Sequence, residues 1–93
     1  MVSCKIRIEN PTGLHLRPIS VLCNRSIEFK SSISIKIDDK TVNAKSMLGV
    51  LSAGIKYGDE IELICDGEDE EEALKILSSM ISAGLGDEYI NKD

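Results

Sequence analysis

Apolar residues follow two periods along this chain, one of two residues and one of about 3.6 residues. A period of two is typical of a strand that buries one face, because successive side chains point to opposite sides of a sheet. It predicts strands over residues 2–9, 32–37, 41–43 and 60–66. The polar run Asp38-Asp39-Lys40 lies between the second and third strands and predicts a hairpin turn.

The helical period occupies the remaining segments. It predicts helices over residues 16–27 and 46–53, and a last helix that starts in the acidic run 68–72 and ends before Gly84 and Gly86. The acidic run lacks the ligand spacing of a calcium-binding loop, and its carboxylates would complement the helix dipole. The order βαββαβα predicts an α+β two-layer sandwich, with three helices over one antiparallel sheet.

The composition indicates one small globular domain over residues 1–93, with 42% hydrophobic residues and a formal net charge of −5. A negative charge argues against nucleic-acid binding, which relies on clustered Lys and Arg. No apolar run approaches the roughly 20 residues of a membrane span. The N-terminal residues enter a strand directly, without the apolar stretch of a signal peptide. We therefore expect a cytoplasmic protein that does not insert into a membrane.

The three cysteines, Cys4, Cys23 and Cys65, are widely spaced and form no Cys-x-x-Cys pair. Each occupies an inward position of its predicted element, where a free thiol behaves as a small apolar side chain. A zinc or redox site is therefore not expected, and neither is a cofactor.

The only histidine of the chain, His15, lies where the first predicted helix begins. The turn formers of residues 10–13 precede it, and Pro18 favours a helix start near Leu16, because a first helical turn does not need the proline N–H. Unpaired N–H groups and the helix dipole at such a start favour an anion. Arg17 adds a fork of donors that suits phosphate oxygens. The pattern predicts a histidine that accepts a phosphoryl group; a histidine that merely caps the helix is the alternative.

Two segments also resemble a known family. Residues 10–18, Asn-Pro-Thr-Gly-Leu-His-Leu-Arg-Pro, are similar to the active-site signature of HPr, the histidine-containing phosphocarrier family of the bacterial sugar phosphotransferase system. Residues 43–51, Asn-Ala-Lys-Ser-Met-Leu-Gly-Val-Leu, resemble the regulatory-serine segment of that family, at the family's spacing. The resemblance implies a sheet of order 1-4-2-3 and His15 as phosphoryl acceptor, with Thr12, Leu16 and Arg17 at the anion site.

The resemblance implies partners as well. Enzyme I, charged by phosphoenolpyruvate, would phosphorylate His15, and sugar-specific enzyme II A components would receive the phosphoryl group. Ser46 would be modified by HPr kinase/phosphorylase, and phospho-Ser46 would bind a catabolite-control repressor. Apolar Met47, Leu48 and Leu51 would form a docking patch beside the histidine, the alternative being that they belong to the core. We expect a monomer.

A regulatory binding protein like the Crh members of the family, working through phospho-Ser46, is the alternative function. Those relatives lack the active histidine, so His15 with Arg17 beside it favours a carrier, although both roles can coexist. An enzyme with its own turnover is less consistent with the sequence, which offers no second general base, metal cluster or Gly-rich phosphate loop.

Four positions depart from the common family pattern. Leu16 and Ile19 stand where small alanines are usual, so we expect either that helix 16–27 lies slightly further from the sheet or that the bulk at Leu16 alters the rim of the site. Asn24 and Ile27 lack the lysines that some relatives direct at an acidic enzyme I. The choice of partner therefore stays open.

Overall fold

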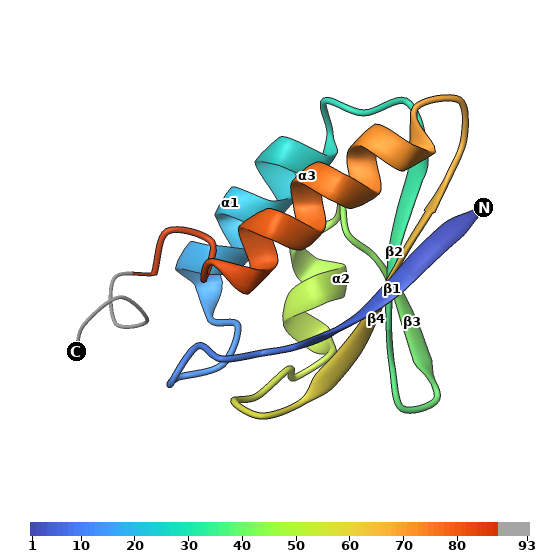
Figure 1. The fold of residues 1–93 in the computed structure, drawn as a ribbon. Coiled ribbons are helices and arrows are strands. Elements are labelled where there is room, and N and C mark those ends of the chain that lie inside the picture. The colour runs from blue at the N-terminus through green and yellow to red at the C-terminus, as the bar shows by residue number, and fades with distance from the viewer. Residues whose placement is uncertain (88–93) are drawn as a thin grey trace.

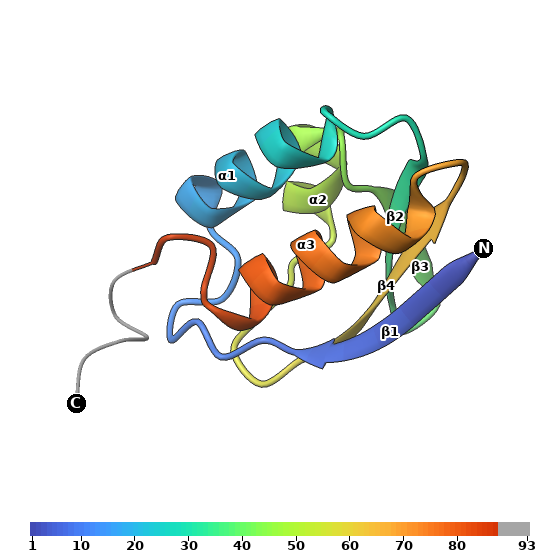
Figure 2. The same cartoon turned by 45° about the horizontal axis from the view of Figure 1, so that its top comes forward.

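The structure, a computed structural model, describes residues 1–87. Within this range the elements are, in chain order, β1 (Val2–Arg7), α1 (Leu16–Ser26), β2 (Ser32–Ile37), β3 (Lys40–Asn43), α2 (Met47–Ser52), β4 (Glu60–Asp66) and α3 (Glu70–Ser82). The four strands form one antiparallel sheet of order β1-β4-β2-β3. The helices lie together on one face of this sheet (Figures 1 and 2). The predicted α+β sandwich and its strand order are confirmed.

The hydrophobic core lies between the sheet and the helices. It is built from aliphatic side chains that both layers bury almost completely: Ile8, Ile33, Ile35, Ile61 and Leu63 from the sheet side, and Ile19, Leu22, Leu77 and Ile81 from the helices. The strand register pairs Ile6 with Ile61, so inward residues of β1 and β4 lie side by side. Phe29, buried as predicted, closes the core beyond the end of α1.

The three cysteines are free, with Cys23 and Cys65 buried and Cys4 half-buried. Burial raises the pKa of the Cys65 thiol to about 11. Since a protonated thiol is a poor nucleophile and metal ligand, these side chains serve as small apolar residues, in agreement with the sequence pattern.

The strand β1 ends at Arg7, two residues earlier than predicted. The chain leaves the ladder there because Ile8 bonds to the turn before β4. Its N–H donates to the carbonyl of Asp59 at 2.8 Å, and its own carbonyl accepts from the N–H of Gly58 at 2.8 Å. This pairing directs the following loop toward the N-terminus of α1, where the predicted site lies.

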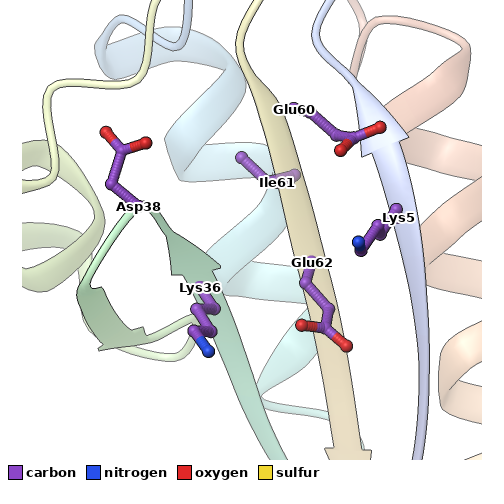
Figure 3. A pocket seen from close by; sticks show the side chains of 6 residues that line it. All are labelled: Lys5, Lys36, Asp38, Glu60, Ile61 and Glu62. Carbon is purple, nitrogen blue, oxygen red and sulfur yellow. The ribbon is translucent and has the colours of Figure 1, made fainter.

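The open face of the sheet is polar. Glu62 in β4 pairs across the strands with Lys5 on one side and Lys36 on the other, so opposite charges are neighbours. This face carries a hollow of about 380 Å³, and Figure 3 shows the side chains that line it: Lys5, Lys36, Asp38, Glu60, Ile61 and Glu62. The predicted site residues are not among those that line it, so this hollow is separate from the candidate site.

None of the helices within residues 1–87 is long and apolar enough to cross a membrane.

Asp69 anchors the start of α3 to the turn between α1 and β2. Its carboxylate accepts hydrogen bonds from the backbone N–H groups of Lys30 at 2.8 Å and Ser31 at 2.9 Å, and from the Ser31 hydroxyl. The helix begins at Glu70, within the acidic run as predicted, and the side chain just before it makes this cross-connection. The bond from the Ser31 hydroxyl, followed by that from the Lys30 N–H, lowers the pKa of Asp69 to about 2.

We expect Asp69→Asn to destabilise the fold at neutral pH and to have less effect in acid. The ionised carboxylate is favoured in the folded state, so its contribution is complete above pH 3.8 and is lost as the pH falls toward about 2. Urea unfolding midpoints of both proteins, measured across this range, should converge at the acidic end. Glu71→Gln, in the exposed first turn of α3, is the matched control. A gap between wild type and Asp69→Asn that does not narrow in acid would contradict this account.

Candidate functional site

The loop before α1 is fixed by a close approach to the connection between α2 and β4. The N–H of Leu14 donates to the carbonyl of Ile55 at 3.0 Å. Gly13 has a φ of +70°, and a Cβ there would lie 2.6 Å from the same carbonyl and 2.9 Å from the Cα of Lys56. Only glycine fits both the conformation and the space. The position at which the chain enters α1 is therefore set by backbone contacts.

His15 occupies the N-cap position of α1, as the sequence predicts. Its backbone is extended, with φ −84° and ψ −174°, and its carbonyl accepts from the N–H of Ile19 at 3.2 Å. The imidazole makes no capping hydrogen bond, and the side chain is 42% exposed. The alternative of a histidine whose ring merely caps the helix is therefore wrong, and the ring is accessible to a ligand.

The first turn of α1 supplies donors beside this ring. The N–H groups of Leu16 and Arg17 come too early in the helix to have partners within it, and Pro18 has no N–H. The side chain of Arg17 is exposed, as is that of Leu16 at 56%. Thr12, also exposed, lies in the preceding loop. The structure thus gathers the predicted anion-site residues around the start of one helix, with Leu16 contributing an exposed apolar rim.

Two polar residues that the sequence interpretation missed lie behind His15. Its Nε2 is 3.5 Å from Oδ2 of Asp87, whose side chain is only 4% exposed. Asn10 is completely buried, and its Nδ2 donates to the same Oδ2 at 3.1 Å and to the carbonyl of Gly84 at 3.1 Å. The loop before α1 and the turn after α3 are joined at this point.

A sequence signal for Asn10 existed. It continues the even-numbered inward positions of the first strand, and a polar side chain on a buried register needs hydrogen-bond partners. Asp87 had no such signal, because it lies 77 residues after Asn10 in the chain and nothing local links the two.

Ser46 is the N-cap of α2, as predicted. Its Oγ accepts from the N–H of Gly49 at 3.0 Å. The helix has only six residues, too few to be stable in isolation, so the cap and the packing of Val50 hold it in place.

The other apolar residues of α2 face outward. Met47, Leu48 and Leu51 are 39%, 79% and 46% exposed, and we call them the α2 patch. The alternative that they belong to the core is wrong. Because α1 packs against α2, this patch lies on the helix next to the one that carries His15.

Within residues 1–87 no cluster of His, Cys, Asp or Glu side chains could hold a metal ion. The donors around His15 are N–H groups and a guanidinium, which suit an anion.

Comparisons with known proteins match nearly the whole chain. A family model described as the PTS HPr component phosphorylation site covers residues 2–83. The HPr-like protein Crh of Bacillus subtilis is 38% identical over 81 residues, which are 87% of this chain and 95% of the relative. The phosphocarrier protein HPr of Lysinibacillus sphaericus is 33% identical over 82 residues, which are 88% and 93% of the two chains.

Solved structures are similar over the same extent. The structure of HPr-C-His from Thermoanaerobacter tengcongensis superimposes with a TM-score of 0.86 at 36% identity, covering 100% of this chain and 99% of the other. An HPr dimer from the same organism has a TM-score of 0.74 at 41% identity, covering 92% and 99% of the two chains.

We expect Ser46→Ala to lower the free energy of unfolding by about 0.5–2 kcal/mol, because the N–H of Gly49 loses its capping acceptor. Ser52→Ala is the matched control, since that exposed hydroxyl only donates to a carbonyl of its own helix. Urea unfolding of the two variants measures the difference. Equal losses at the two serines would show that the capping bond contributes nothing.

Proposed function

The chain belongs to the HPr/Crh family of phosphocarrier proteins, and we propose that it accepts a phosphoryl group on His15 from enzyme I and passes it to sugar-specific enzyme II A components. The observation that carries this proposal is the half-exposed imidazole at the start of α1, which is not engaged in capping the helix. A carrier needs such a nucleophile, accessible to a donor and then to an acceptor.

The first turn of α1 supplies the binding energy for the phosphoryl group. We assign Nδ1 as the acceptor atom, because it is the ring nitrogen nearer the backbone N–H groups. The phosphoryl oxygens would contact the backbone N–H groups of Leu16 and Arg17, the Arg17 guanidinium and the Thr12 hydroxyl. The positive end of the helix dipole would also attract the phosphoryl group. The site is open, so it stabilises the phosphorylated state only moderately, as repeated transfer requires.

The α2 patch is the proposed docking surface for enzyme I and the enzyme II A components. Its exposed apolar side chains lie close to the His15 helix, and flexible Met47 adapts to more than one partner surface. A monomer keeps this patch open, so we expect a monomer, although a related HPr forms a dimer.

A regulatory binding protein, as in Crh, is the second candidate function. Ser46 at the N-terminus of α2 favours it, because a phosphoryl group there would meet the favourable end of the helix dipole without disturbing the core. Regulation through Ser46 needs no accessible imidazole, however, and His15 is accessible. We therefore assign the carrier role first, with Ser46 as its switch and HPr kinase/phosphorylase as the modifying enzyme.

Incubation with enzyme I and phosphoenolpyruvate tests the carrier function. The wild type should gain one phosphoryl group, seen as a mass increase that acid reverses, because a phosphorus–nitrogen bond is acid-labile. His15→Ala should gain none, and Ser46→Ala, which retains the imidazole, serves as the control. An acid-labile phosphoryl group on His15→Ala would contradict the assignment.

We expect Ser46→Asp to slow phosphorylation of His15 by enzyme I while leaving thermal stability nearly unchanged. A charge at this position complements the helix dipole but must be desolvated when the adjacent α2 patch docks. Rates should be measured at matched enzyme I concentrations beside Ser52→Asp, which places the same charge at the other end of α2. If Ser46→Asp reacts as fast as wild type, Ser46 is not a switch for the carrier.

A further inference from the structure

We propose that Asp87 is a positioning residue for His15, which holds the imidazole with Nε2 toward its carboxylate and leaves Nδ1 as the free nucleophilic nitrogen. The inference rests on the proposed carrier function, since it concerns how the same histidine is prepared for transfer. It adds to the site a residue from beyond α3, whose carboxylate oxygen lies 3.5 Å from Nε2 of His15.

The geometry places one carboxylate oxygen against one ring nitrogen. Oδ2 of Asp87 is 3.5 Å from Nε2 of His15. The Asp87 side chain is 4% exposed, whereas the His15 side chain is 42% exposed. A carboxylate with so little access to water interacts strongly with the few polar groups around it. Nε2 of His15 therefore faces a buried carboxylate, while the side chain as a whole stays partly exposed.

The carboxylate is held in place independently of the histidine. Asn10 donates from Nδ2 to Oδ2 of Asp87 at 3.1 Å, and the backbone N–H of Asp87 donates to the carbonyl of Gly84 at 2.9 Å. That same carbonyl accepts the second hydrogen of the Asn10 amide at 3.1 Å. Asn10 is completely buried, so the partner that holds Asp87 is itself enclosed by the fold.

A negative charge near Nε2 selects between the two forms of a neutral imidazole. The ring carries one N–H, and a carboxylate beside Nε2 favours the form with the hydrogen on that nitrogen. The lone pair is then on Nδ1, the atom assigned as phosphoryl acceptor. The same arrangement orients histidines that bind metals, where a carboxylate on one nitrogen fixes the ring and exposes the other.

Asp87 would also stabilise the phosphorylated ring. In the transfer step the Nδ1 lone pair forms the bond to phosphorus, and the bond from phosphorus to the donor atom breaks with its electron pair going to the donor. The ring still carries its hydrogen on Nε2 and becomes positive. The Asp87 carboxylate faces this charge, and when the phosphoryl group leaves, the electron pair returns to Nδ1.

Two variants of Asp87 separate positioning from charge. Asp87→Ala removes the acceptor, whereas Asp87→Asn keeps a carbonyl that can accept from Asn10 but removes the charge. The matched control is Asp39→Ala, which deletes an exposed carboxylate in the turn between β2 and β3. Unfolding temperatures and amide spectra show that each variant is folded, and Asp87→Asn carries the test if Asp87→Ala is not.

The first measurement is the ring ¹⁵N spectrum of the unmodified protein at about pH 8.5, where histidine rings are neutral. The share of the Nε2–H form should be higher in wild type and Asp39→Ala than in Asp87→Ala. The second is the rate of His15 phosphorylation at saturating enzyme I. It should fall by about fivefold in Asp87→Ala, the upper end of what half-exposed charge pairs contribute, and by less in Asp87→Asn.

Unchanged ring spectra in both Asp87 variants would overturn the proposal. A changed spectrum with a wild-type transfer rate would overturn it too, because the positioning would then have no consequence for transfer. If enzyme I phosphorylates wild type normally and the Asp87 variants behave like Asp39→Ala, the carrier function stands and only the role of Asp87 falls. If wild type is never phosphorylated, the carrier function fails, and the ring spectra still decide whether Asp87 sets the hydrogen position.

Discussion

The site depends on the contact between the loop before α1 and the connection from α2 to β4. The N–H of Leu14 bonds to the carbonyl of Ile55 at 3.0 Å, and Gly13 passes so close that no side chain fits. Backbone contacts of this kind cannot be adjusted by changing a rotamer, so they fix the direction in which α1 starts. Because His15 is the N-cap of that helix, its place relative to α2 follows from the same contact.

A second connection ties the site to the end of α3. Buried Asn10 bonds to Gly84 and Asp87, which joins the start of α1 to a segment more than 70 residues later in the chain. Burial of an amide N–H is costly unless its hydrogen bonds are made, and the two bonds donated by Nδ2 of Asn10 favour this arrangement of the two segments. The surface around His15 is thus assembled from three parts of the chain, while the imidazole stays partly exposed.

Most of the fold could be predicted from the sequence because the sheet buries only one face. Isoleucines at every second position of β2 and aliphatic residues in β4 give an unambiguous period of two. The end of β1 could not be placed, since Ile8 keeps the inward pattern but bonds to the turn before β4. The hydrophobic period of a segment predicts the position of a helix or strand well, but it does not predict which distant segments contact each other.

In the candidate site, too, residues with local sequence signals could be predicted, whereas residues that act through distant contacts could not. His15 and Ser46 could be found because local helix signals lie near each: Pro18 marks the start of the first helix, and Gly54 marks the end of the short helix that Ser46 begins. Asp87 approaches His15 only through the folded chain. A polar residue at the inward position of Asn10 indicated an unmet hydrogen-bond requirement, but the sequence could not name the partner.

The short helix α2 shows how the fold can leave an apolar surface exposed. A helix of six residues gains little from its own hydrogen bonds, so it depends on the Ser46 cap and on buried Val50 and Ala53. With stability supplied from its inner side, the outer side can expose the apolar α2 patch at no cost to the core. A larger helix would bring its own stability but also a larger apolar stripe that the small sheet could not cover. The exposed patch on the helix next to α1 is therefore a consequence of how little of α2 the core needs.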